Sequence, residues 1–225
     1  MSVPLRLDNP SMTIELGRGV YDACRAAALA GVPLRTLNDW TKRALHRPSL
    51  SPHPRVRRCS WSDLLALRAV DWLRRTKHLS DFRTEPFRNI HQALQELEKE
   101  GLSREVARAL AVSPRGEVLM LPERDLAVRT TPDRRTASPD VLPLIAPYGA
   151  SGPDLLEPRP LLRIIPGKLH GEPHVIDTRI ASAALYALHQ SGYTEPRILE
   201  MYPDVSSEAL RQAIDLEQSL QASAA

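Results

Sequence analysis

The sequence has few aromatic residues and no long apolar run. Phenylalanine, tryptophan and tyrosine together make up 4% of its 225 residues. No stretch approaches the about 20 consecutive apolar residues that cross a bilayer, and no apolar segment near the start resembles a signal peptide. These absences argue against a membrane protein and against a secreted one. We therefore expect a cytoplasmic protein with no membrane partner.

Cysteine is also scarce. Cys24 and Cys59 lie far apart, without a CxxC pair or a cluster of cysteine and histidine. This pattern argues against a disulfide framework and a zinc finger, and we expect two buried free thiols. His170 and His174 flank Gly171, but no third ligand follows at a suitable spacing. We therefore expect no metal site and no cofactor.

Catalytic patterns are missing as well. The chain contains no glycine-rich phosphate loop, and no nucleophile turn supports a Ser-His-Asp set drawn from its scattered residues. We therefore expect no catalytic residues, and we expect the protein to be a regulator and not an enzyme.

Proline and local positive charge are abundant. The 20 prolines indicate many chain breaks, and the formal net charge is only +3 although the isoelectric point is about 9.1. Basic residues greatly outnumber acidic ones between His46 and Arg83, whereas the last helix is more acidic. Such a patch is typical of a solvated surface or of one that binds an anion such as DNA.

The periodicity of apolar residues predicts a mainly α fold with small β elements (α+β). A first helix over 22–29 ends at Gly31, and Pro33 opens a second with Leu34, Leu37 and Trp40 on one face. A proline- and arginine-rich stretch over 46–58 follows, which we interpret as a two-stranded wing or an extended loop. Ser60 and Asp63 then start a third helix, and a fourth opens near residues 84–86 and ends at Gly101.

The second half divides into a connector and another helical part. We predict a β-hairpin turning at Pro122–Asp125, a short helix through Val141–Ile145, and strands at Leu161–Ile165 and Val175–Ile176. Three further helices are expected over 180–190, 194–201 and 206–220. The predicted domains are a winged helix-turn-helix (1–105), a β-hairpin and Pro-rich connector (106–160) and a C-terminal helical module (161–225).

The first four helices resemble the MerR-like winged helix-turn-helix. The residues that carry the resemblance are 26–37 (AAALAGVPLRTL), the basic excursion after them and 62–67 (SDLLAL). The resemblance implies that the second helix enters the DNA major groove, with Arg35, Thr36 and Lys42 on it, and that the wing follows the backbone. Asn38 and Asp39 depart from the family, which often has an arginine and an aromatic residue there.

The C-terminal module is similar to the antitoxin-type DUF433 family. The matching residues are Gly171-Glu172-Pro173, Val175-Ile176, Thr178-Arg179-Ile180, Gly192, Met201-Tyr202-Pro203 and Val205-Ser206. Asp177 replaces the usual glycine of the family. Together the two parts resemble a VapB-type antitoxin, which implies binding to a PIN-domain ribonuclease toxin and to the promoter DNA of its own operon. We also expect a homodimer, because a single reading helix spans too few base pairs.

These expectations give two sets of candidate residues. The DNA-binding set is Arg35, Thr36, Asn38, Lys42, Arg43, Arg55, Arg57 and Arg58. For the toxin, Arg211 is a basic candidate for an acidic nuclease site, and Leu220 has little chain after it to bury against. Two alternatives remain open: a ligand-sensing transcription factor without a toxin, and a protein–protein adaptor that has lost DNA binding, as Asn38 and Asp39 suggest.

Overall fold

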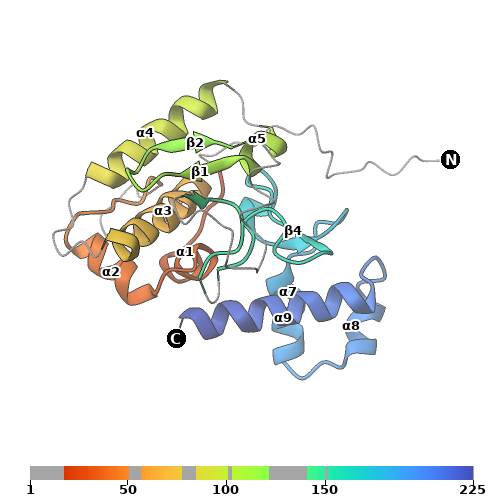
Figure 1. The fold of residues 1–225 in the computed structure, drawn as a ribbon. Helices are drawn as coiled ribbons and strands as arrows, with labels where there is room; N and C mark the ends of the chain where they lie inside the picture. The colour runs from red at the N-terminus through yellow and green to blue at the C-terminus, as the bar shows by residue number, and fades with distance from the viewer. Residues whose placement is uncertain are drawn as a thin grey trace, which may run out of the picture.

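The computed structural model describes residues 18–50, 57–77, 85–100, 103–121, 141–149 and 152–224. Helices dominate these residues, accompanied by a three-stranded and a two-stranded antiparallel sheet (Figure 1). The predicted mainly α, α+β class is confirmed. In the described part of the chain, no helix combines the length and apolar character that a membrane span requires.

Helices α1 (Ala23–Ala30) and α2 (Leu34–Lys42) are joined by a short turn at the predicted place. The Asp22 side chain accepts a hydrogen bond from the Arg25 amide at 2.8 Å, which caps the start of α1. Gly31 ends α1 with φ of 71°, in the left-handed region, and the next amide, of Val32, returns to the Ala27 carbonyl. The small residues of α1 are buried, as the sequence indicated.

Helix α3 (Trp61–Lys77) is the central buried helix, and α4 (Glu85–Glu100) packs along it (Figure 1). The predicted cap of α3 is confirmed as a reciprocal pair. Asp63 accepts from the Ser60 amide at 2.7 Å, and Ser60 Oγ accepts from the Asp63 amide at 3.3 Å. Buried apolar side chains of both helices form the core predicted from their periodicity: Leu64, Leu67, Val70, Leu73, Phe87, Ile90 and Leu94.

The middle of the chain differs from the prediction. After the short helix α5 (Arg104–Arg108), β1 (Leu110–Val112) pairs with β2 (Val118–Met120) in a hairpin that turns at 113–117. The turn predicted at Pro122–Asp125 lies outside the described residues. Ser113 stabilises this turn, since its Oγ accepts from two turn amides at 3.2 Å each. The helix expected at Val141–Ile145 is wrong, because Leu142–Pro143 forms strand β3 on the other edge of β1. Leu126 and Val128 lie outside the described residues.

The C-terminal elements follow the predicted order. Strands β4 (Leu162–Arg163) and β5 (His174–Val175) pair with each other, and the short 3-10 helix η1 (Leu169–Gly171) lies between them in the sequence. Helices α7 (Ser182–Gln190), α8 (Glu195–Met201) and α9 (Ser207–Ala224) come next. Asp177 has φ of 58°, so this residue adopts the left-handed conformation for which glycine is favoured.

Helix α9 packs on α7 and on α1, and so joins the C-terminal helices to the first helix (Figure 1). An ion cluster lies at the second contact. Arg25 of α1 reaches Glu217 of α9 at 2.6 Å and Glu172, which precedes β5, at 2.7 Å. Glu217 is only 5% exposed, and these carboxylates raise the pKa of Arg25 against the opposing effect of its burial. The first helix and the last are therefore joined by charges that solvent screens weakly.

Arg68 of α3 links α1 to the segment before β4. Its side chain is fully buried and donates to six carbonyl oxygens, those of Leu29, Ala30, Leu144, Ile145, Ala146 and Pro153. Burial lowers the pKa of Arg68 to about 9, which leaves it charged at neutral pH. A guanidinium with these partners satisfies the carbonyls at the end of α1 and fixes residues 144–146 and Pro153 against the helix.

Candidate nucleic-acid interface

One face of α2 is fixed to the core. Leu37 and Trp40 are buried, and the Trp40 ring meets Phe87 of α4 edge-on with centroids 5.3 Å apart. Arg74 of α3 lies over the same indole ring at 5.8 Å. Because these contacts come from α3 and α4, the orientation of α2 is fixed by its packing on two other helices.

The opposite face of α2 carries the candidate basic residues. Arg35, Lys42 and Arg43 are exposed, and Thr36 and Asn38 are half-buried. Asp39 is exposed on the same helix and pairs with Arg43 at 3.6 Å, where both side chains are more than half exposed. A pair of this kind is weak, and it leaves the face with a net positive charge.

The end of the proline-rich stretch contacts α2 directly. Arg57 Nη1 donates to Asn38 Oδ1 at 3.0 Å, so two residues that the sequence assigned to one DNA-binding surface do lie together. Arg58 is exposed, and its carbonyl accepts from the Leu50 amide at 3.2 Å. Arg55 lies outside the described residues, as do the other residues of the predicted wing between 51 and 56. The Asn38 oxygen has a second lone pair and its amide nitrogen can still donate, so Arg57 fixes this side chain without removing its capacity to read a base.

The two candidates on α9 have different environments. Arg211 is exposed, and its polar partners among the described residues lie on its own helix: the Ser207 carbonyl at 3.3 Å and the Glu208 carboxylate at 3.8 Å. Leu220 is 2% exposed and belongs to the core, so its expected role as an uncovered interface residue is wrong. The reason is that α9 continues to Ala224 and lies along α1, which covers this position.

A shallow pocket of about 210 Å³ opens beside the packing of α9 on α1. Its lining comes from α1, from the residue before it and from α9: Asp22, Cys24, Arg25, Ala28, Glu217, Leu220 and Gln221. Cys24 is exposed and free, which corrects the expectation that both thiols are buried; Cys59 is free and buried as expected. The pocket is smaller than most sites for drug-sized ligands, which hold about 300 Å³ or more.

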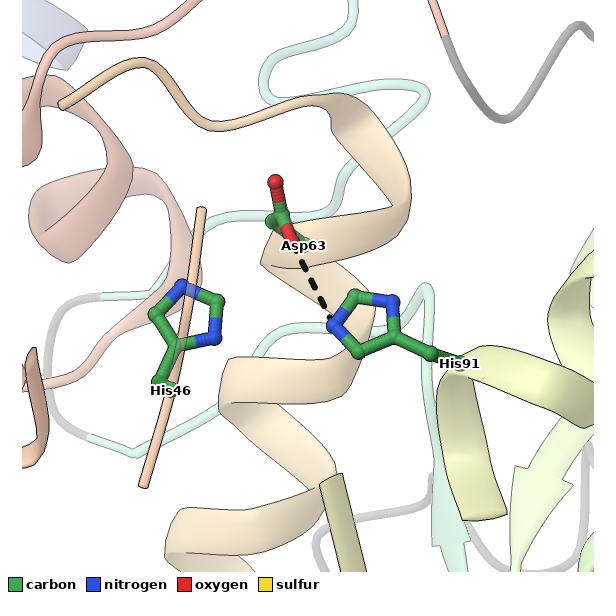
Figure 2. A group of neighbouring side chains, drawn as sticks. All are labelled: His46, Asp63 and His91. Atoms are coloured by element: carbon green, nitrogen blue, oxygen red, sulfur yellow. Dashed lines mark ion pairs between the residues drawn. The ribbon is translucent and has the colours of Figure 1, made fainter. Parts of the chain in front are cut away.

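A group of three polar residues, of which His46 and Asp63 are buried and His91 is half-buried, was missed by the sequence interpretation. His46 follows α2, Asp63 lies in the first turn of α3, and His91 lies on α4 (Figure 2). One potential ligand atom from each lies within 4.8 Å of the other two. Asp63 was identified only as a helix cap, and the two histidines are too far apart in sequence to form a recognisable motif.

Comparison with known proteins supports part of the resemblance. Residues 163–215 match the family described as "Protein of unknown function (DUF433)". A crystal structure of Rv2018 from Mycobacterium tuberculosis is 18% identical, covers 94% of this chain and 100% of its own, and superposes with a TM-score of 0.43. No curated protein matches the chain. The similarity of the C-terminal module to DUF433 is thus confirmed over those residues, and the family description gives no activity.

Proposed function

We propose that the protein is an antitoxin of a type II toxin–antitoxin system. In this proposal a homodimer binds the promoter DNA of its own operon, with α2 in the major groove, and the C-terminal module binds and neutralises a PIN-domain ribonuclease. The observation that carries the proposal is the basic outer face of α2, held rigidly by Trp40 and extended by Arg57.

The DNA part rests on charge and geometry. Arg35, Lys42 and Arg43 are exposed on a helix whose other face is buried, which is how a reading helix approaches a duplex. Arginine and lysine neutralise phosphates and release counterions, so binding should weaken strongly as salt increases. Arg57 lies at the edge of the same surface, where it is suited to a backbone contact.

The toxin part rests on the match of residues 163–215 to DUF433 and on the resemblance of the two modules, taken together, to VapB-type antitoxins. Arg211 is the residue of α9 that we propose for the acidic site of the nuclease, since its guanidinium is exposed. Leu220 is excluded from this role because it is buried against α1.

DNA binding is tested by fluorescence anisotropy on the DNA upstream of the gene. Replacing Arg57 and Arg58 by alanine should weaken binding and make the dependence of log K on log salt less steep, by about one for each phosphate that is no longer neutralised. A matched control replaces Arg115 and Arg197, which are exposed arginines on other elements, and removes the same charge. If both double variants lost the same affinity, the loss would be explained by the change in net charge alone. That result would contradict the assignment of Arg57 and Arg58 to the DNA-binding surface.

Toxin binding is tested by coexpression with the product of the adjoining gene. Copurification of the two chains, suppression of ribonuclease activity and loss of both in Arg211→Glu are the expected results. If the chain binds DNA but no nuclease, it is a regulator without a toxin. If it binds neither, the adaptor interpretation, in which Asn38 and Asp39 have removed DNA binding, replaces the proposal.

A further inference from the structure

The cluster of His46, Asp63 and His91 lies at the junction of three helices that are separate in sequence. Figure 2 shows the two imidazoles converging on the Asp63 carboxylate, one from the loop after α2 and one from α4. The rings are nearly parallel, at 12°, with centroids 6.2 Å apart. Asp63 Oδ1 lies 3.3 Å from His91 Nε2.

His46 is the least satisfied member of the cluster. Its side chain is 1% exposed, and neither ring nitrogen has a hydrogen-bond partner among the described residues. A buried polar atom without a partner costs about 1–3 kcal/mol, so native proteins rarely retain one without compensation. His91 Nε2 and Asp63 Oδ1 likewise have no hydrogen bond there, and one potential ligand atom of each of the three residues lies within 4.8 Å of the other two.

Asp63 is oriented for a second task besides capping α3. Its Oδ2 atom accepts from the Ser60 amide at 2.7 Å, from the Ser49 amide at 3.0 Å and from Ser49 Oγ at 2.7 Å. These bonds occupy one oxygen and hold the carboxylate plane, which leaves Oδ1 directed at the histidines. Carboxylate ligands of metals are typically fixed in this manner by hydrogen bonds from surrounding groups.

We propose that His46, Asp63 and His91 bind one divalent transition-metal ion, with zinc as the expected occupant. Two imidazole nitrogens and one carboxylate oxygen form a donor set that suits zinc and its neighbours, whereas magnesium and calcium prefer oxygen alone. With three protein ligands, a water molecule or another small ligand completes a tetrahedral shell. The side chain of His91 is 22% exposed, which provides a route from solvent.

The electrostatic state of the histidines favours this occupant. Burial lowers the pKa of both His46 and His91, and the nearby Asp63 charge only partly opposes it. A lowered pKa favours the neutral imidazole, which has the lone pair that a metal requires.

A metal here would fix the position of α2. His46 lies directly beyond this helix, and its ring contacts Phe87 at 5.1 Å between centroids. Phe87 in turn supports Trp40, the main anchor of α2. Binding would thus join the end of α2 to α3 and α4, which predicts a structural role that does not depend on the proposed function.

The test measures zinc binding to the full chain without a histidine tag. Isothermal titration and elemental analysis after dialysis should give one equivalent per chain. Single variants His46→Gln and His91→Gln should each lose at least tenfold in affinity. The control His189→Gln, which replaces a half-buried histidine on α7, should bind as the unaltered chain does.

Two further measurements on the unaltered chain remain decisive if a variant fails to fold. Cobalt in place of zinc should give the visible absorption of a tetrahedral or five-coordinate site. Zinc should raise the melting temperature by several degrees, and a chelator should reverse the rise. The proposal is overturned if no stoichiometric metal binds, or if binding survives in folded His46→Gln and His91→Gln.

Discussion

The turn between α1 and α2 can be tested by adding a single methyl group at Gly31. This residue has φ of 71°, and a Cβ built on it would lie 2.8 Å from Gly152 Cα and 2.8 Å from the Tyr148 carbonyl oxygen. Both obstacles are backbone atoms, so they cannot rotate away as a side-chain tip would. Gly31→Ala therefore combines a left-handed alanine with a backbone collision.

The expected size follows from these two effects. A left-handed conformation costs an L-residue about 1–2 kcal/mol, and overpacking costs about 1–3 kcal/mol more. We expect Gly31→Ala to lower the free energy of unfolding by about 2–5 kcal/mol. Gly192 is the matched control, since its φ is 86° and an added Cβ would meet nothing within 4 Å. Gly192→Ala should therefore show the conformational cost alone, about 1–2 kcal/mol.

Urea denaturation followed by far-ultraviolet circular dichroism measures both variants. Alanine also lowers the conformational entropy of the unfolded chain, by the same amount at both sites. This contribution therefore cancels when the change in unfolding free energy of one variant is subtracted from that of the other. That difference isolates the collision with the backbone of Tyr148 and Gly152 and should be about 1–3 kcal/mol. Equal destabilisation of the two variants would show that this loop does not pack against the turn, which would refute the described arrangement.

Two further substitutions test the buried contacts. Arg68→Met should lower the free energy of unfolding by about 3–5 kcal/mol, because six carbonyl oxygens lose a charged donor. Arg68→Lys should lower it by less, since lysine keeps the charge. A loss below about 1 kcal/mol in the methionine variant would contradict the role of Arg68 in linking α1 to the segment before β4. Leu220→Ala should cost about 2–5 kcal/mol as a core truncation, measured in the same assay. Unchanged stability with weakened toxin binding would instead return Leu220 to the interface role.

Much of the fold could be predicted because its signals are local. Gly31 ends α1, Pro33 opens α2, and Ser60 with Asp63 begins α3, each through contacts within a few residues. The three C-terminal helices were recognisable for the same reason. The charged face of α2 also follows from spacing alone, since burial of Leu37 and Trp40 determines which side chains face outward.

The errors arise where distant segments decide the outcome. Residues 142–143 form a strand and not the expected helix, because they pair with β1, which lies about thirty residues earlier in the chain. Exposure of Cys24 and burial of Leu220 both depend on how α9 lies against α1. The group around His46 has no sequence spacing to reveal it, because its members meet only when α4 packs on α3.

The charges around Arg25 make the start and the end of the protein interdependent. A fragment that stops before Glu172 would keep the guanidinium but neither carboxylate, and it would uncover the face of α1 on which α9 rests. Removing one partner of a buried pair is strongly destabilising. We therefore expect that neither half keeps its native fold when it is produced alone. A loss of activity in a deletion variant would then reflect misfolding and could not be assigned to the part that was removed.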